Sequence, residues 1–121
     1  YRGVMATLRA MLNGNADIGS TLHFIQDSGI DTGDIISVVT VPLESQSSYL
    51  FNVLSLYGRG VKQIMNAVRS FSDSTALQSY PQQGIPGYFT FPTMAELNRF
   101  SGQGHKLFDP QERAKINRLY T

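Results

Sequence analysis

The chain has 121 residues, of which 41% are hydrophobic and 16% charged, which is typical of one folded domain and excludes a wholly disordered chain. Ten basic and nine acidic side chains give a formal net charge of +1, so neither nucleic acid nor a membrane surface is expected to bind through charge. The lack of cysteine excludes disulfides, thiol catalysis and thiolate metal sites, and without a long apolar run the simplest expected location is cytoplasmic.

The first predicted element is a short helix. Val4, Leu8 and Leu12 recur at helical spacing, and Gly14 follows where a helix can end in a left-handed residue. The sequence starts at Tyr1 rather than at methionine, so either the true N-terminus is processed or, as we expect, the sequence is the C-terminal part of a longer protein.

Two predicted strands follow. Residues Ser20–Ile25 alternate in polarity, which places Thr21 and His23 on one face. Residues Ile35–Val41 form a β-branched run that is typical of a buried strand. Between the strands lies an Asp- and Gly-rich loop at residues 27–34, so the pair resembles a long hairpin.

A long helix is predicted next, with Ser47 or Ser48 as its N-cap. Apolar residues repeat along it at alternating spacings of four and three, and we expect this stripe to belong to the core. The stripe consists of Leu50, Leu54, Tyr57, Val61, Ile64 and Val68.

The rest of the chain predicts shorter elements. Residues 72–87 are rich in Ser, Gln, Pro and Gly, which indicates a linker or a surface excursion. A short aromatic extended segment at Tyr88–Phe91 precedes a capping box formed by Thr93 and Glu96. A last helix begins at Asp109-Pro110.

The loop between the strands is the segment most suited to chemistry. It presents Asp27, Asp31 and Asp34 among the glycines Gly29 and Gly33. Glycines allow backbone N–H groups to approach a ligand, and a carboxylate held there could accept a proton. Most Asp/Gly loops are ordinary turns, however. A calcium loop of the EF-hand type would need alternating ligands and a terminal Glu, so no metal is predicted.

Four motifs in this region resemble a known family. In chain order they are Tyr1-Arg2-Gly3, Leu12-Asn13-Gly14, Gly19-Ser20-Thr21-Leu22-His23-Phe24 and Asp27-Ser28-Gly29-Ile30-Asp31-Thr32-Gly33-Asp34-Ile35-Ile36. Their order and spacing resemble the folate-dependent formyltransferases, whose branches act on methionyl-tRNA, glycinamide ribonucleotide or sugar amines, or hydrolyse formyltetrahydrofolate.

The resemblance implies an α/β fold, namely the C-terminal part of a Rossmann-like sheet with a β-hairpin and a long packing helix. Residues 1–71 would form this part of the catalytic domain. Residues 72–121 would be a linker and short-helix tail, for which the resemblance gives no role.

The resemblance also implies the reaction, which is transfer of a formyl group from 10-formyltetrahydrofolate to an amine. Asp31 matches the catalytic aspartate of the family. The family's catalytic Asn and His lie before the position of Tyr1, so the isolated chain is expected to be inactive. His23 matches a histidine that supports the loop, although a hydrogen-bonded strand histidine without a functional role explains it equally well.

Further site residues follow from the same resemblance. Arg2 and Gly3 would lie near the amine substrate, where an arginine suits a phosphate or carboxylate; Arg2 is explained slightly better as a surface side chain. Asp34 is expected to brace the turn or the start of the second strand. The loop residues expected to bind the folate are Asp27, Ser28, Gly29, Ile30, Thr32 and Gly33.

The form of the Asp31 loop is closer to the methionyl-tRNA and sugar-amine branches than to the purine branch. Low net charge and a tail without a barrel pattern favour a small-molecule amine, such as a sugar nucleotide, over nucleic acid. Hydrolysis of the formyl folate would use the same residues, so a hydrolase remains an alternative. A second alternative is a non-catalytic binding or interaction module on the same scaffold.

A partner for the scaffold itself is also expected. Two strands make a marginal sheet, so the chain alone should expose an apolar face or a sheet edge. The missing N-terminal half or another chain, including a second copy in a homo-oligomer, would cover that surface.

Overall fold

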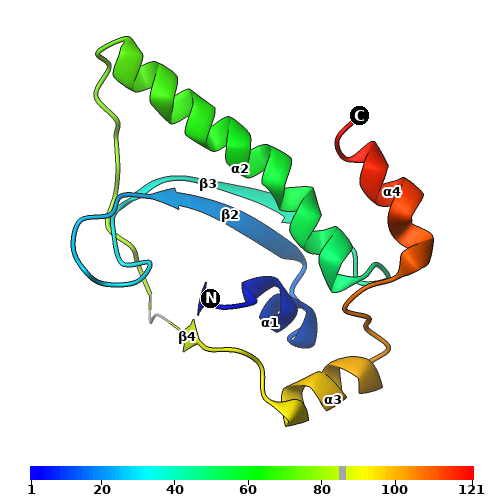
Figure 1. Cartoon of the computed structure of the whole chain (residues 1–121). Helices are drawn as coiled ribbons and strands as arrows, with labels where there is room; N and C mark the ends of the chain where they lie inside the picture. Colours follow the sequence, from blue (N-terminus) through cyan, green and yellow to red (C-terminus); the bar gives the residue numbers. More distant parts are fainter. Residues whose placement is uncertain (85–86) are drawn as a thin grey trace.

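The structure is a computed structural model that describes residues 1–84 and 87–121 (Figure 1). It has an α/β fold of short strands and helices around one long helix. The elements are β1 (Arg2–Gly3), α1 (Ala6–Leu12), β2 (Asp17–His23), β3 (Ile35–Pro42), α2 (Tyr49–Ser72), β4 (Tyr88–Phe89), α3 (Met94–Gly102), a 3-10 turn (Pro110–Glu112) and α4 (Arg113–Arg118).

The predicted hairpin is confirmed, with both ends of its first strand displaced. Strands β2 and β3 pair antiparallel, with Ile18 opposite Val41. β2 begins at Asp17 rather than at the predicted Ser20, because Ile18 is buried and packs with Val41. β2 also ends before Ile25, which is 90% exposed in the loop.

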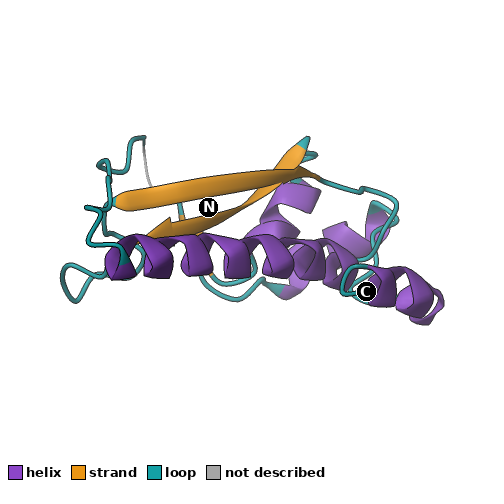
Figure 2. Ribbon diagram, turned by 90° about the horizontal axis from the view of Figure 1, so that it is seen from above, coloured by secondary structure: helices purple, strands orange, loops and turns teal. Residues whose placement is uncertain are grey.

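Helix α2 runs along the hairpin, and α1 lies near the start of β2, where its Ala10 packs in one cluster with Ile18 and Leu56 (Figure 1). The view from above shows α2 beside the two strands over most of their length (Figure 2). The Ser48 hydroxyl caps α2 by accepting the backbone N–H of Phe51 at 3.2 Å, which confirms one of the two predicted caps. The Glu112 carboxylate accepts the backbone N–H of Ser48 at 3.0 Å and so connects the C-terminal segment to α2.

The hydrophobic core lies near the start of β2, away from the Asp-rich loop. Leu8 and Met11 of α1 are almost fully buried and pack with Phe100 of α3. A second cluster joins Ala10 to the hairpin. The end of the hairpin that carries residues 24–34 is therefore free of this packing.

The expectation that the apolar stripe of α2 is core is wrong. Tyr57, Val61, Ile64 and Val68 are each at least half exposed. Helical periodicity identifies two faces but not the one that packs. The face that lies against the hairpin instead carries Leu56, Gly60 and Gln63. The Gln63 side chain donates to the Ser37 hydroxyl at 2.9 Å.

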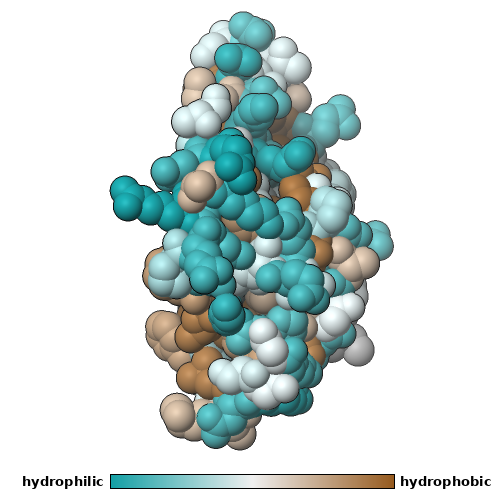
Figure 3. Space-filling view, turned by 90° about the vertical axis from the view of Figure 1, so that its right-hand side faces the viewer, coloured by the Kyte–Doolittle hydropathy of each residue, from teal (hydrophilic) through white to brown (hydrophobic). Residues whose placement is uncertain are grey.

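The chain was also expected to expose an apolar face, and the exposed stripe of α2 provides one. Among the residues that the structure describes, no strand pairs with the outer edge of β2. The face seen from the right of Figure 1 is mostly hydrophilic, with apolar areas gathered in the lower part of one side (Figure 3). None of the described helices combines the length and apolarity that a membrane crossing needs.

The segment predicted as a linker packs against the hairpin. The backbones of Tyr80 and Ile35 exchange hydrogen bonds of 2.8 and 3.0 Å, forming an isolated bridge at the start of β3. Further along, β4 pairs in parallel with β1, and Arg2 lies opposite Tyr88. These contacts bring residues near position 80 to the Asp-rich loop.

Helix α3 begins as predicted. The Thr93 hydroxyl accepts the backbone N–H of Glu96, and the Glu96 carboxylate accepts the backbone N–H of Thr93 at 2.8 Å, which completes the capping box. Glu96 also pairs with Arg9 of α1, a cation that is almost fully buried. This pair connects α3 to the core helix.

Candidate active site

The loop at residues 24–34 is closed at its base by backbone and side-chain bonds. Phe24 donates its backbone N–H to the Asp34 carbonyl at 2.9 Å. The side-chain Oε1 of Gln26 accepts the backbone N–H of Asp34 at 2.8 Å, and Nε2 of Gln26 donates to the Asp34 carboxylate at 3.4 Å. Asp34 therefore braces the base of the loop, one of the two positions expected for it.

Asp27 orders the tip of the loop. Its Oδ1 accepts the backbone N–H of Gly29 at 2.7 Å and the hydroxyl of Thr32 at 3.1 Å, which forms an Asx turn. A side chain at Gly29 would clash with Thr32, because an added Cβ would lie 2.5 Å from its hydroxyl oxygen. The tip residues are exposed and leave a loop surface facing solvent.

Asp31 has an unusual backbone conformation for a side-chain-bearing residue. Its φ is 55°, in the left-handed region that aspartate tolerates better than most residues. Oδ2 accepts the backbone N–H of Gly3 at 3.3 Å, and Oδ1 lies 3.5 Å from Nε2 of His23. Such strain persists only where neighbouring contacts support it, and it is common at functional sites.

The His23 ring is held between two oxygen atoms. Its Nδ1 lies 2.9 Å from the Phe24 carbonyl oxygen, while Nε2 faces Asp31. Both ring nitrogens thus face oxygen atoms, which fixes the orientation of the ring. His23 thus contacts the loop through both ring nitrogens, and its role in supporting the loop stays a prediction.

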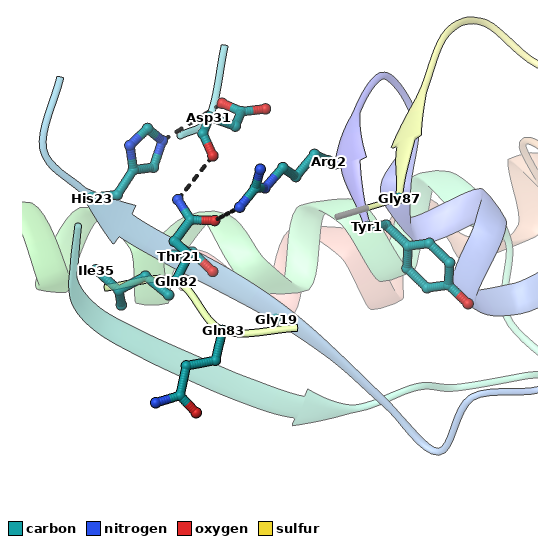
Figure 4. A pocket seen from close by; sticks show the side chains of 10 residues that line it. All are labelled: Tyr1, Arg2, Gly19, Thr21, His23, Asp31, Ile35, Gln82, Gln83 and Gly87. Atoms are coloured by element: carbon teal, nitrogen blue, oxygen red, sulfur yellow. Dashed lines mark hydrogen bonds and ion pairs between the residues drawn. The ribbon is translucent and has the colours of Figure 1, made fainter. Parts of the chain in front are cut away.

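A glutamine from the supposed linker completes the cluster (Figure 4). Nε2 of Gln82 donates to the backbone carbonyls of Asp31 and Gly33 at 2.8 and 2.7 Å. Its Oε1 accepts from the guanidinium of Arg2. The sequence offered no motif for Gln82, since these contacts span about fifty positions of the chain and only the folded hairpin creates them.

Asp31, His23, Arg2, Thr21 and Gln82 line a cleft of about 390 Å³. The cleft lies beside the face of β2 that carries both Thr21 and His23, in agreement with the predicted alternation (Figure 4).

Among the predicted site residues, the structure brings Asp31 and Arg2 to the wall of the cleft, and Gly3 touches Asp31 through its backbone. Arg2 is held in a β-pairing, not on a frayed end. The six predicted folate-binding residues do not line the cleft, but they form the loop next to it.

In chemical terms the cleft combines an anionic oxygen, a cation and hydroxyl and amide groups. Asp31 can accept a proton from a reacting group or orient it, and Arg2 can attract an anion. These are features of a site for acid–base chemistry on an anionic substrate.

Known proteins are similar to this chain in sequence and in fold. No protein-family model matches the chain. The chain is 31% identical over 98 residues to the methionyl-tRNA formyltransferase of Hydrogenobaculum sp. strain Y04AAS1. The aligned region covers 79% of this chain and 31% of that protein. It thus spans less than a third of the length of this curated relative.

Solved structures that superpose on this chain include two formyltransferases. The sugar 3N-formyltransferase WlaRD, crystallised in the presence of dTDP and 5-N-formyl-THF, has a TM-score of 0.66 and 26% identity over 74% of this chain and 32% of its own. The N-formyltransferase of Helicobacter canadensis, in complex with folinic acid and dTDP-3-aminofucose, has a TM-score of 0.61 and 31% identity, over 74% of this chain and 33% of its own.

Proposed function

The chain belongs to the formyltransferase family and spans 31 to 33% of the three relatives named above, and we propose that it carries the aspartate-bearing part of an active site that transfers a formyl group to an amine. The observation that carries the proposal is the position of Asp31. Its carboxylate lies at the wall of the cleft beside His23 and is backed by the Gly3 N–H.

The formyl donor in this proposal is 10-formyltetrahydrofolate. The cleft volume of about 390 Å³ lies within the usual range for small-molecule sites, about 300–1,000 Å³. The exposed loop beside it offers backbone groups to a flat polar ring. The residues proposed to contact the donor are Asp27, Ser28, Gly29, Ile30, Thr32 and Gly33.

Asp31 would handle the proton that moves during the reaction. When bound, the donor supplies the formyl group to the amine nitrogen. As the new C–N bond forms, the amine must lose a proton, and the Asp31 carboxylate accepts it directly or through one water. Asp31 then returns that proton to the folate nitrogen as its bond to the formyl carbon breaks. His23 would keep the carboxylate turned into the cleft.

For the acceptor we propose an amino sugar carried by a nucleotide. Arg2 lines the cleft and could bind its phosphate groups, with Gly3 beside it. The net charge of +1 gives little attraction for a tRNA backbone. The two solved relatives are sugar or N-formyltransferases, whereas the curated relative acts on methionyl-tRNA, so the acceptor needs a direct test.

Activity would need more than this chain. The exposed apolar side of α2 and the outer edge of β2 are surfaces that the rest of a formyltransferase, or another chain, would cover. The Asn and His of the family motif would come from that other part. We therefore expect no formyl transfer by the 121 residues alone.

The test uses the longest natural form of the protein with 10-formyltetrahydrofolate and a set of dTDP-amino sugars. We expect a formylated amine, and a loss of about 1,000-fold in kcat for Asp31→Asn. Asp73→Asn, an exposed aspartate at the end of α2, is the matched control and should keep full activity.

The same assay separates the alternatives. Formate release that is independent of any amine would identify a hydrolase. Absence of both reactions, with Asp31→Asn indistinguishable from the parent, would leave a non-catalytic binding module.

A further inference from the structure

The side chain of Gln82 forms hydrogen bonds with the backbone on both sides of Thr32. Its two N–H groups are both used, one on the Asp31 carbonyl and one on the Gly33 carbonyl. These bonds act on the peptide backbone, whereas His23 and Gly3 act on the Asp31 carboxylate. Gln82 therefore contributes what the other contacts do not, namely support for the loop backbone where Asp31 is left-handed.

Gln82 is itself held in place by the fold. The backbone bridge between Tyr80 and Ile35 fixes the segment two residues earlier against the start of β3. Gln82 is half-buried, while its neighbours Pro81 and Gln83 are exposed. In Figure 4 the Gln83 side chain extends away from the cluster that Gln82 joins.

The third contact of Gln82 reaches the other side of the cleft. Its Oε1 accepts from the Arg2 guanidinium, so one amide joins a cation that lines the cleft to the backbone of Asp31. Movement of Arg2, for instance on binding an anion, would therefore be transmitted through the Gln82 amide to the backbone of the Asp31 loop.

We propose that Gln82 is a positioning residue, which holds the left-handed Asp31 in its reactive place and connects it to Arg2. The inference rests on the proposed function for its catalytic consequence. Its structural consequence, an ordered loop, is independent of any reaction.

The first test compares kinetics of Gln82→Leu with the parent, in the longest natural form of the protein. Loss of the three hydrogen bonds should displace the carboxylate and lower kcat by about 100-fold, as small misplacements of reacting groups do. The KM for the formyl donor should rise as well, because the loop that Gln82 supports carries the residues proposed to contact the donor. Gln78→Leu, an exposed glutamine of the same segment, is the matched control and should change neither constant.

A double-mutant cycle separates positioning from general damage to the protein. If Gln82 acts through Asp31, then Gln82→Leu should lower kcat little further once Asp31→Asn is present. Two full losses that multiply would show that Gln82 acts elsewhere and would overturn the inference. Should Gln82→Leu fail to fold, Gln82→Asn takes its place in the cycle. It keeps the amide but shortens the side chain by one methylene, which moves the amide away from its partners.

The second test does not require activity. Hydrogen exchange of the loop amides should be faster in Gln82→Leu than in the parent, and unchanged in Gln78→Leu. If the parent protein transfers no formyl group, the proposed function fails, yet the exchange comparison still decides whether Gln82 holds the loop. Equal exchange in parent and Gln82→Leu would overturn the inference even in an active enzyme.

Discussion

His23 and Asp31 face each other at the open end of the hairpin, with Nε2 of the imidazole 3.5 Å from Oδ1 of the carboxylate. The ring is oriented from its other side, because Nδ1 lies against the Phe24 carbonyl. The side chains are 24% and 45% exposed, so the pair is open to a ligand from the cleft but is partly shielded from water. A strand residue thus sets the direction of a loop carboxylate.

This geometry predicts different effects for two substitutions of His23. His23→Gln can keep a donor near the Nε2 position and should retain most of the activity of the longest natural form. His23→Asn keeps only a donor near Nδ1, so it loses the contact with Asp31 and should lower kcat about tenfold, which corresponds to about 1.4 kcal/mol of transition-state stabilisation. Equal kcat values for the two variants would contradict the proposed contact.

The base of the loop predicts a strong effect of a single methyl group. Gly33 is buried, and an added Cβ would lie 1.6 Å from the Phe24 carbonyl oxygen. Gly33→Ala should therefore lower the free energy of unfolding by about 3 kcal/mol in urea denaturation.

Gly58→Ala is the control, because an added Cβ there meets no atom within 4 Å on the exposed side of α2. It should raise the free energy of unfolding by up to about 1 kcal/mol through helix propensity. Destabilisation of the same size at both positions would argue against the described loop base.

Acid sensitivity is predicted at the start of α3. The backbone N–H of Thr93, and with it the Thr93 hydroxyl and the Arg9 guanidinium, lowers the pKa of the Glu96 carboxyl below its ordinary 4.5. A lowered folded-state pKa means that the stabilisation is present above the ordinary value and is lost as the pH falls through the folded-state pKa.

Glu96→Gln should therefore reduce the difference in unfolding free energy between pH 7 and pH 3. Urea denaturation at the two pH values measures it. Asp73→Asn, at an exposed aspartate, should leave that difference unchanged. A Glu96→Gln variant with the pH dependence of the parent would contradict this account of the capping box.

The exposed side of α2 predicts the behaviour of the 121-residue chain on its own. Val61 and Ile64 are 58% and 52% exposed, so the chain should self-associate in light scattering as its concentration rises. Val61→Lys with Ile64→Lys should reduce that association while changing the unfolding free energy by less than about 0.5 kcal/mol. A chain that is monomeric at all concentrations would contradict the proposed need for a covering partner.

Local signals in the sequence predicted the elements whose causes are local. The Ser48 cap and the Thr93–Glu96 capping box depend on neighbouring residues, and the hairpin depends on a period of two. The catalytic candidate Asp31 was found through a motif of adjacent residues. Such features do not require knowledge of the tertiary fold.

What the sequence did not reveal depends on distant contacts. The packing face of α2 was misassigned, because the face that packs holds Leu56 together with Gln63, whose amide N–H donates to the Ser37 hydroxyl of β3. The role of Gln82 appears only when the Tyr80 bridge brings a supposed linker to the loop. Periodicity and motifs contain neither relationship.

The central claim, that Asp31 lies beside the reacting atoms, is tested most directly by a crystal structure of the longest natural form with 5-formyltetrahydrofolate, a stable analogue of the donor. We expect the ring system against residues 27–33 and the Asp31 carboxylate within hydrogen-bond distance of the formyl-bearing region, directly or through one water. A ligand bound outside this cleft, with the Asp31 carboxylate facing bulk solvent, would contradict the account.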